Sequence, residues 1–150
     1  MASQQTTLIL LPGLDGTGLV FEPLLKHLPA TIEPVVVGYP GDEPMTFPEH
    51  IDFVKARLPK DKPFVLLAES FSGPIALQLL AEPPENLVGV VFVATFERYP
   101  KPFLLDLARL LPQGPLQRLF ATSLLCRFFC LGSADREAVA LFQKALASVK

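Results

Sequence analysis

The sequence predicts an α/β protein: a short parallel sheet with flanking helices, followed by a C-terminal helical cap. Four short segments are continuously hydrophobic or rich in β-branched residues, which is typical of strands covered on both faces. They are Thr6–Leu11, Glu33–Gly38, Pro63–Ala68 and Leu87–Ala94. Helical patterns lie between them, and this alternation indicates βαβ units and a parallel sheet. Right-handed crossovers would place the helices on the faces of that sheet.

Three helices are predicted between these strands, at residues 19–28, 46–58 and 73–81. In the first, apolar residues recur every four positions at Val20, Leu24 and Leu28. The second begins with Thr46-x-x-Glu49, a possible capping box in which each side chain bonds the other residue's backbone N–H. The third is apolar along its length and ends before two prolines.

After residue 95 the pattern becomes helical throughout, with no further predicted strand. Helices are expected at 102–111, 115–131 and 133–149, separated by Pro112-Gln113-Gly114 and by Gly132-Ser133. We therefore expect residues 1–95 to form the sheet core and residues 96–150 to form a helical cap or appendage.

Composition narrows the range of functions. The chain has 150 residues, 50% of them hydrophobic and 19% charged, and a net charge of −2 without a basic run. That length fits one domain, and that charge argues against a nucleic-acid partner. The N-terminus lacks a leader pattern and no segment has the length of a bilayer span, so we expect a cytoplasmic protein. Cys126 and Cys130 lie one helical turn apart without a nearby histidine, so we expect packing residues, no metal and no cofactor.

The segment LLAESFSGP, residues 66–74, places Ser70 between a predicted strand and a predicted helix. This is the setting of a nucleophile elbow, in which a strained turn exposes a serine hydroxyl above the sheet. Only small residues fit two positions away on either side. Ala68 and Ser72 stand there, where glycine is usual. A helix that starts at the serine would offer the Phe71 N–H to a developing oxyanion.

A second donor is expected from LLPGLDGTG, residues 10–18, where another strand ends in a glycine-rich loop. Such a loop allows close backbone approach to a substrate, with the Leu14 N–H as donor. The loop could instead be only a tight turn. Asp15 could orient a water molecule or the loop, or could equally cap the helix that starts near Gly18. Phosphate binding is disfavoured because no Walker lysine follows.

These motifs resemble the α/β-hydrolase superfamily, particularly small bacterial hydrolases with LPG-x-DGTG and a small-E-S-F-small-G elbow. The resemblance covers about residues 7–95, and residues 96–150 resemble the start of the helical cap of such enzymes. It implies a serine hydrolase acting on esters or thioesters, with Ser70 as nucleophile. Family members carry an acid and then a histidine after the serine. No histidine follows Ser70 in this chain, which therefore looks truncated.

Of the two histidines, His50 is the candidate base. By the family's strand order its strand lies two places from that of Ser70. At about 4.8 Å per strand this is roughly 10 Å, too far for a direct hydrogen bond without an unusual bend. A base from a second subunit is an alternative. Glu69 and Asp15 are expected to line the substrate pocket, and Glu97 begins the cap.

We therefore expect hydrolysis of short-chain carboxylic esters or thioesters through an acyl-Ser70 intermediate. Without a complete triad, such an enzyme retains roughly 10³–10⁴-fold catalysis over water. The alternative is a non-catalytic remnant or a fragment that oligomerises or binds an apolar ligand. The apolar edge strand at 87–94 and the apolar cap helices predict a homodimer or higher oligomer.

Overall fold

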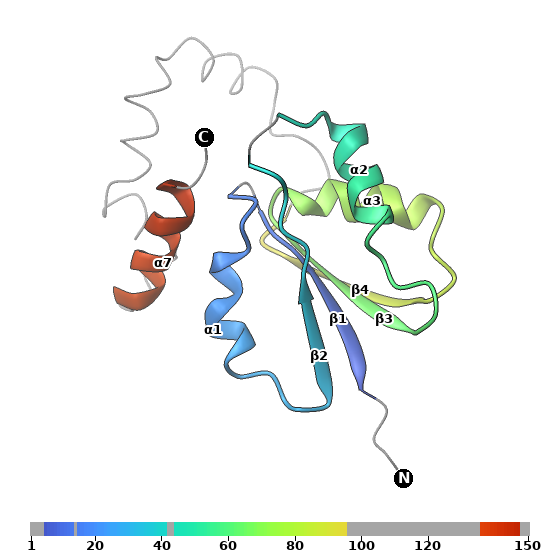
Figure 1. Cartoon of the computed structure of the whole chain (residues 1–150), viewed down its shortest axis with the longest axis horizontal. Coiled ribbons are helices and arrows are strands. Elements are labelled where there is room, and N and C mark those ends of the chain that lie inside the picture. Colours follow the sequence, from blue (N-terminus) through green and yellow to red (C-terminus); the bar gives the residue numbers. More distant parts are fainter. Residues whose placement is uncertain (1–4, 14, 42–43, 96–135, 148–150) are drawn as a thin grey trace.

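The computed structural model describes residues 5–13, 15–41, 44–95 and 136–147. Within these residues, parallel strands form one sheet in the order β2-β1-β3-β4 (Figure 1). The strands are β1 (Thr6–Leu11), β2 (Ile32–Val36), β3 (Phe64–Glu69) and β4 (Leu87–Val93). The helices are the 3₁₀ helix η1 (Leu19–Phe21), α1 (Glu22–Leu25), α2 (Phe47–Lys55), α3 (Ser72–Ala81) and α7 (Arg136–Ala147). The predicted parallel α/β sheet is confirmed, and each predicted strand overlaps an observed one.

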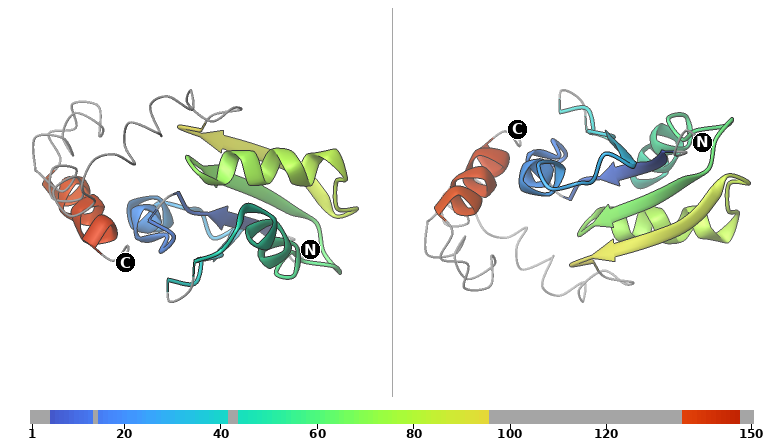
Figure 2. Two further views of the ribbon diagram at one scale, coloured as in Figure 1. Left: turned by 90° about the horizontal axis from the view of Figure 1, so that it is seen from above. Right: turned by 90° about the horizontal axis from the view of Figure 1, so that it is seen from below.

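Helices α2 and α3 cover one face of the sheet (Figure 2). Residues of β1 and β3 interdigitate there with the apolar sides of both helices, as their alternating inward positions require. The buried members of this core are Ile9, Leu11, Val37, Ile51, Val54, Leu58, Phe64, Leu66, Ala68, Ile75, Ala76 and Leu79. This is the larger of the two cores, and it fixes the start of α3 against β3.

The second face carries a smaller core under η1 and α1. Phe21 of η1 packs on Leu10 of β1 and Leu67 of β3, with partly buried residues of β2 and α1 around them. In register, Leu67 pairs with Val91 of β4. Leu67 is only 8% exposed, whereas Val91 is 45% exposed. Among the described residues, coverage of this face therefore stops at β3.

The helix predicted at residues 19–28 is shorter than expected, and only part of its predicted apolar stripe faces the sheet. The chain forms η1 and then the four-residue α1. Phe21 and Leu25 contact the sheet, whereas Leu24, part of the predicted apolar stripe, is 38% exposed. The turn at Gly18 has a left-handed φ of 74° and aims Phe21 at the core. Tertiary burial of one aromatic side chain therefore outweighed the local four-residue periodicity.

The capping box predicted at the start of α2 is confirmed. The Thr46 N–H donates to Glu49 Oε2 at 2.6 Å, and the Glu49 N–H donates to the Thr46 hydroxyl at 3.5 Å. These bonds satisfy backbone donors that a helix start leaves without partners. The hydrogen bonds from Thr46 also lower the pKa of Glu49.

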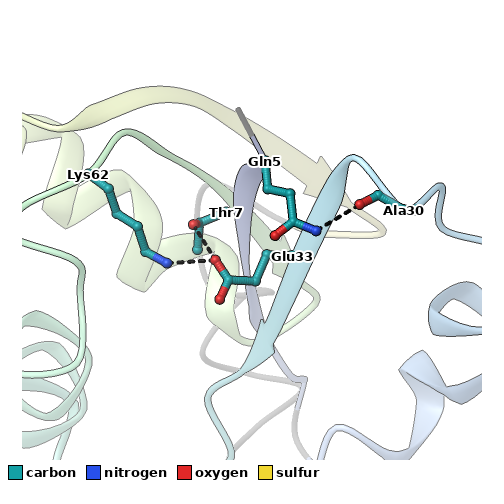
Figure 3. Close-up of polar contacts among 5 residues, drawn as sticks. All are labelled: Gln5, Thr7, Ala30, Glu33 and Lys62. Carbon is teal, nitrogen blue, oxygen red and sulfur yellow. Dashed lines mark hydrogen bonds and ion pairs between the residues drawn. The ribbon is translucent and has the colours of Figure 1, made fainter. Parts of the chain in front are cut away.

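Polar side chains join the amino ends of three strands, at the edge opposite Ser70 (Figure 3). Glu33 of β2 accepts a hydrogen bond from Thr7 of β1 at 3.0 Å and pairs with Lys62, just before β3, at 2.6 Å. The bonds from Lys62 and Thr7 lower the pKa of Glu33. Gln5 donates to Ala30 O at 2.9 Å and adds a tie between the segments that precede β1 and β2.

Helix α7 lies beside η1 and α1 (Figures 1 and 2). An ion pair of 3.1 Å joins Lys26 Nζ to Glu137 Oε1, and Ala145 is fully buried. Part of the helix predicted at 133–149 is thus observed. The helices predicted at 102–111 and 115–131 lie outside the described residues, and the division at residue 95 stays a prediction. No helix in the described ranges is long and apolar enough to cross a membrane.

Candidate functional site

Ser70 lies at the turn between β3 and α3, on the carboxyl edge of the sheet. β3 is an inner strand, flanked by β1 and β4. The backbone φ of Ser70 is 47°, in the left-handed region that a residue with a Cβ seldom occupies. The strained turn predicted for this serine is therefore confirmed. Phe71 follows with φ −54° as the N-cap residue, and α3 begins at Ser72, two residues after the serine.

Three hydrogen bonds hold the Ser70 backbone in this conformation. Its N–H donates to Val93 O at 3.0 Å, which continues the pairing of β3 with β4. Its carbonyl accepts from the Gly73 N–H at 3.1 Å and from the Thr95 hydroxyl at 2.8 Å. A strained conformation persists only where its surroundings determine it in this way.

Gly73 has no room for a side chain. A Cβ on this residue would lie 1.5 Å from Thr95 Oγ1 and 2.6 Å from Thr95 Cβ. The close approach lets the Thr95 hydroxyl reach the Ser70 carbonyl over the first turn of α3. The small residue that the sequence pattern requires here thus has a specific steric cause.

Ser72 occupies a position where glycine is usual in the elbow motif, and it is fully buried. Its hydroxyl donates to the carbonyl of Pro12, at the end of β1. Tyr39, in the loop after β2, places its hydroxyl 2.5 Å from Ser72 Oγ. Burial is the main reason that the pKa of Tyr39 rises to about 12. Sequence reasoning missed Tyr39, because nothing in its local segment marks a bond to a residue 33 positions away.

The glycine loop after β1 is folded by Asp15. Its Oδ2 accepts hydrogen bonds from the Thr17 N–H at 3.1 Å, from the Gly18 N–H at 3.2 Å and from the Thr17 hydroxyl. These bonds show Asp15 orienting the loop itself, one of the roles expected for it, whereas among the described residues no side-chain bond caps η1 at Gly18. Gly16 and Gly18 both have positive φ, which explains glycine at these positions. Leu14, the predicted second oxyanion donor, lies outside the described residues.

Glu69 extends its carboxylate against this loop. A Cβ on Gly13 would lie 2.1 Å from Glu69 Oε2, so the side chain occupies the space that the glycine leaves open. Burial is the largest cause that raises the pKa of Glu69 to about 7, followed by the charge of Asp15. A hydrogen bond with the Gly13 backbone acts in the opposite direction. Glu69 therefore exchanges its proton near neutral pH, directly beside Ser70 in the chain.

His50, the candidate base, lies among aromatic rings close to the elbow. Its ring centroid is 5.2 Å from that of Phe71 and 5.0 Å from that of Tyr39. Nδ1 lies 2.9 Å from Thr46 O, and because a carbonyl only accepts, Nδ1 is the donor of this bond, which leaves Nε2 as the acceptor of a neutral ring. The predicted strand order, with β1 between β2 and β3, is confirmed. Within the described residues, no hydrogen bond joins His50 to Ser70.

Phe71 offers the predicted backbone donor on the elbow side. It is the residue before α3, and its N–H has no backbone partner among the described residues. The positive end of the helix dipole lies at the same place. A serine hydroxyl on a strained turn, an N–H without a backbone partner in the described part of the chain and a helix start together form an arrangement that can add a nucleophile to a carbonyl and stabilise the resulting oxyanion.

A pocket lies at the opposite end of the fold, away from Ser70. Its lining residues are the last residue of α2 and residues that follow α2 and α3, near the amino ends of β3 and β4: Lys55, Leu58, Pro59, Lys60, Glu82, Pro84, Glu85 and Asn86. No group of three or more metal-ligating side chains occurs in the described part of the chain. Neither feature bears on the chemistry of the serine.

Comparison of the chain with protein-family models, with curated proteins and with solved structures found no match. Support for a function thus comes from the residues of this chain alone.

The positive φ of Ser70 predicts an unusual order of stability between two substitutions. Ser70→Gly should be more stable than Ser70→Ala by about 1 kcal/mol, because only glycine adopts this conformation without a Cβ clash. Gln78, exposed in α3, is the control: in a helix, glycine should be less stable than alanine by about 1 kcal/mol. Urea unfolding of the four variants measures both differences. The same sign at both positions would show that Ser70 is unstrained.

The raised pKa of Glu69 predicts that the stability of the fold depends on pH. Its pKa is higher in the folded state than its ordinary value of 4.5, so the folded state binds the proton more tightly. The stability of the wild type relative to Glu69→Gln should fall between about pH 5 and pH 8, by an amount on the order of 2 kcal/mol.

Urea unfolding at several pH values measures this fall. Glu33→Gln is the control, because the pKa of Glu33 is lowered. The stability that ionised Glu33 contributes is lost only as the pH drops below its ordinary value of 4.5, so it stays constant between pH 5 and pH 8. A constant difference for Glu69→Gln over that range would contradict the raised pKa.

Proposed function

We propose that this protein is a serine hydrolase that cleaves short-chain carboxylic esters or thioesters through an acyl-enzyme on Ser70. The observation that carries the proposal is the left-handed backbone of Ser70, at the exit of an inner parallel strand and at the start of a helix. A non-glycine residue kept in such a conformation by three hydrogen bonds to its backbone is typical of a site where strain serves a purpose.

In the proposed reaction, the Ser70 hydroxyl attacks the ester carbonyl, its proton passes to the base, and the Phe71 N–H stabilises the oxyanion. The tetrahedral intermediate then expels the alcohol or thiol, which takes that proton, and a water molecule hydrolyses acyl-Ser70 to the carboxylic acid and the free serine. The Leu14 N–H is the proposed second donor. His50 is the proposed base of this chain, because its Nδ1–H donates to Thr46 O and leaves Nε2 to accept a proton. Its contact with the Phe71 ring supports this role, since it places the imidazole beside the elbow. Glu69 and Asp15 border the proposed substrate pocket on the side of the glycine loop.

The assay is hydrolysis of p-nitrophenyl butyrate by the purified chain, by Ser70→Ala and by His50→Ala. We expect weak wild-type turnover, loss of it in Ser70→Ala, and a kcat about 10²- to 10⁴-fold lower in His50→Ala, which is the usual contribution of a general base. A fluorophosphonate should add one adduct at Ser70, detected by mass spectrometry, in the wild type only. Turnover unchanged in Ser70→Ala, together with absent labelling, would sink the proposal.

A second candidate function is that of an oligomerising or apolar-ligand-binding module without turnover. One observation favours it: β4 has no strand neighbour on its outer side among the described residues, and Val88, Val91, Phe92 and Val93 on it are 40–63% exposed. An open apolar edge of this kind can pair with a second copy of the chain.

The oligomer is tested by light scattering coupled to size exclusion. The wild type should elute as a dimer or larger, and Val88→Lys/Val91→Lys should elute as a monomer of unchanged far-UV circular dichroism. Leu77→Lys/Leu80→Lys, on the exposed side of α3, is the matched control and should remain associated. A monomeric wild type at every concentration would contradict the oligomerising module without affecting the esterase proposal.

A further inference from the structure

A chain of two hydroxyl groups links the ends of β1 and β2 to the first turn of α3. Pro12 O is a carbonyl and only accepts, so Ser72 uses its single proton on it. Ser72 Oγ must then accept from the Tyr39 hydroxyl, 2.5 Å away. Because the pKa of Tyr39 is raised to about 12, that proton is present throughout the physiological pH range. The direction of both hydrogen bonds is therefore fixed.

Tyr39 also holds the glycine loop through its backbone. Its N–H donates to Gly16 O at 2.7 Å, and a Cβ on Gly16 would be in van der Waals contact with Tyr39 Cβ at 3.5 Å. Pro12 and Gly16 stand on either side of Leu14 in the sequence. Tyr39 is thus connected to the loop before Leu14 through Ser72, and after Leu14 directly.

We propose that Tyr39 and Ser72 are positioning residues that hold the glycine loop in register with the elbow, so that an oxyanion donor from each side faces one substrate oxygen. This inference rests on the proposed function. It also accounts for serine in place of glycine at position 72. A glycine there would take this partner away from the buried Pro12 carbonyl and from the partly buried Tyr39 hydroxyl.

If the link between Tyr39, Ser72 and Pro12 were purely structural, breaking it would lower the stability of the fold. It would not change how strongly the site stabilises negative charge on the substrate oxygen. The two roles separate when the carbonyl oxygen of the substrate is replaced by sulfur. Backbone N–H groups bind a developing oxyanion more strongly than a developing thiolate-like sulfur, so a well-aligned oxyanion hole favours the oxygen ester. Misalignment should therefore slow the oxygen ester selectively.

The experiment compares p-nitrophenyl butyrate with its thionoester analogue in the wild type, Tyr39→Phe and Ser72→Ala. We expect kcat for the oxygen ester to fall about 10- to 100-fold in each variant, less than or similar to the loss of one whole oxyanion donor. KM and the thionoester rate should change less than about threefold, and the double variant should be no slower than the slower single variant, because both break one link.

Thr7→Val is the matched control, since it also removes a hydroxyl group, that of a buried residue of β1 at the opposite edge of the sheet. Its oxygen-to-sulfur rate ratio should equal that of the wild type. If Tyr39→Phe and Ser72→Ala slowed both esters equally, the ratio of the oxygen-ester rate to the thionoester rate would stay at its wild-type value, and the positioning role would be overturned.

Amide hydrogen exchange distinguishes failure of this inference from failure of the proposed function. In Ser72→Ala, the Gly16 and Tyr39 amides should exchange at least about 10-fold faster than in the wild type, after correction for global stability. The Leu66 and Leu67 amides of β3 should exchange at the wild-type rate after the same correction. This holds whether or not the wild type cleaves esters. Unchanged exchange at Gly16 and Tyr39 would overturn the link itself, even in an active enzyme.

Discussion

The sharp turn at Ser70 is the constraint on which the carboxyl edge of this sheet depends. A chain that leaves an inner strand and begins a helix two residues later must change direction within one residue, and the φ of 47° at Ser70 does this. The turn presses the first residues of α3 against the neighbouring strands. Gly73 therefore meets Thr95 beyond β4, and Ser72 meets Pro12 beyond β1. The small residues around the serine are consequences of that close approach.

Most of this architecture could be predicted because its signals are local. Apolar runs marked the strands, Thr46 and Glu49 marked a helix start, and a serine between small residues marked the turn. The role of Tyr39 could not be predicted, since its partners are 33 and 23 residues away in the chain. For the same reason, the short α1 was mistaken for a longer helix: burial of Phe21 on the sheet, which no local pattern reveals, decided its shape.

The two faces of the sheet are unequally covered, and this affects the site. The face under α2 and α3 has a continuous core that anchors α3 and with it the elbow. Among the residues that the structure describes, η1 and α1 cover the opposite face only as far as β3, and Glu69 and Val93 form the last pair of β3 and β4 in register. The carboxylate beside Ser70 thus stands at the border between a packed region and an exposed strand, which explains why its burial is only partial.

The two carboxylates near Ser70, those of Asp15 and Glu69, have different surroundings. Each of these surroundings suits the proposed reaction, which creates an oxyanion. Asp15 is bonded to two backbone N–H groups and a hydroxyl of its own loop, so its charge is compensated where it stands. Glu69 is partly desolvated next to Asp15, and its pKa of about 7 allows it to lose its charge near neutrality. In the proposed reaction, a protonated Glu69 would remove a repulsion that opposes negative charge on the bound carbonyl.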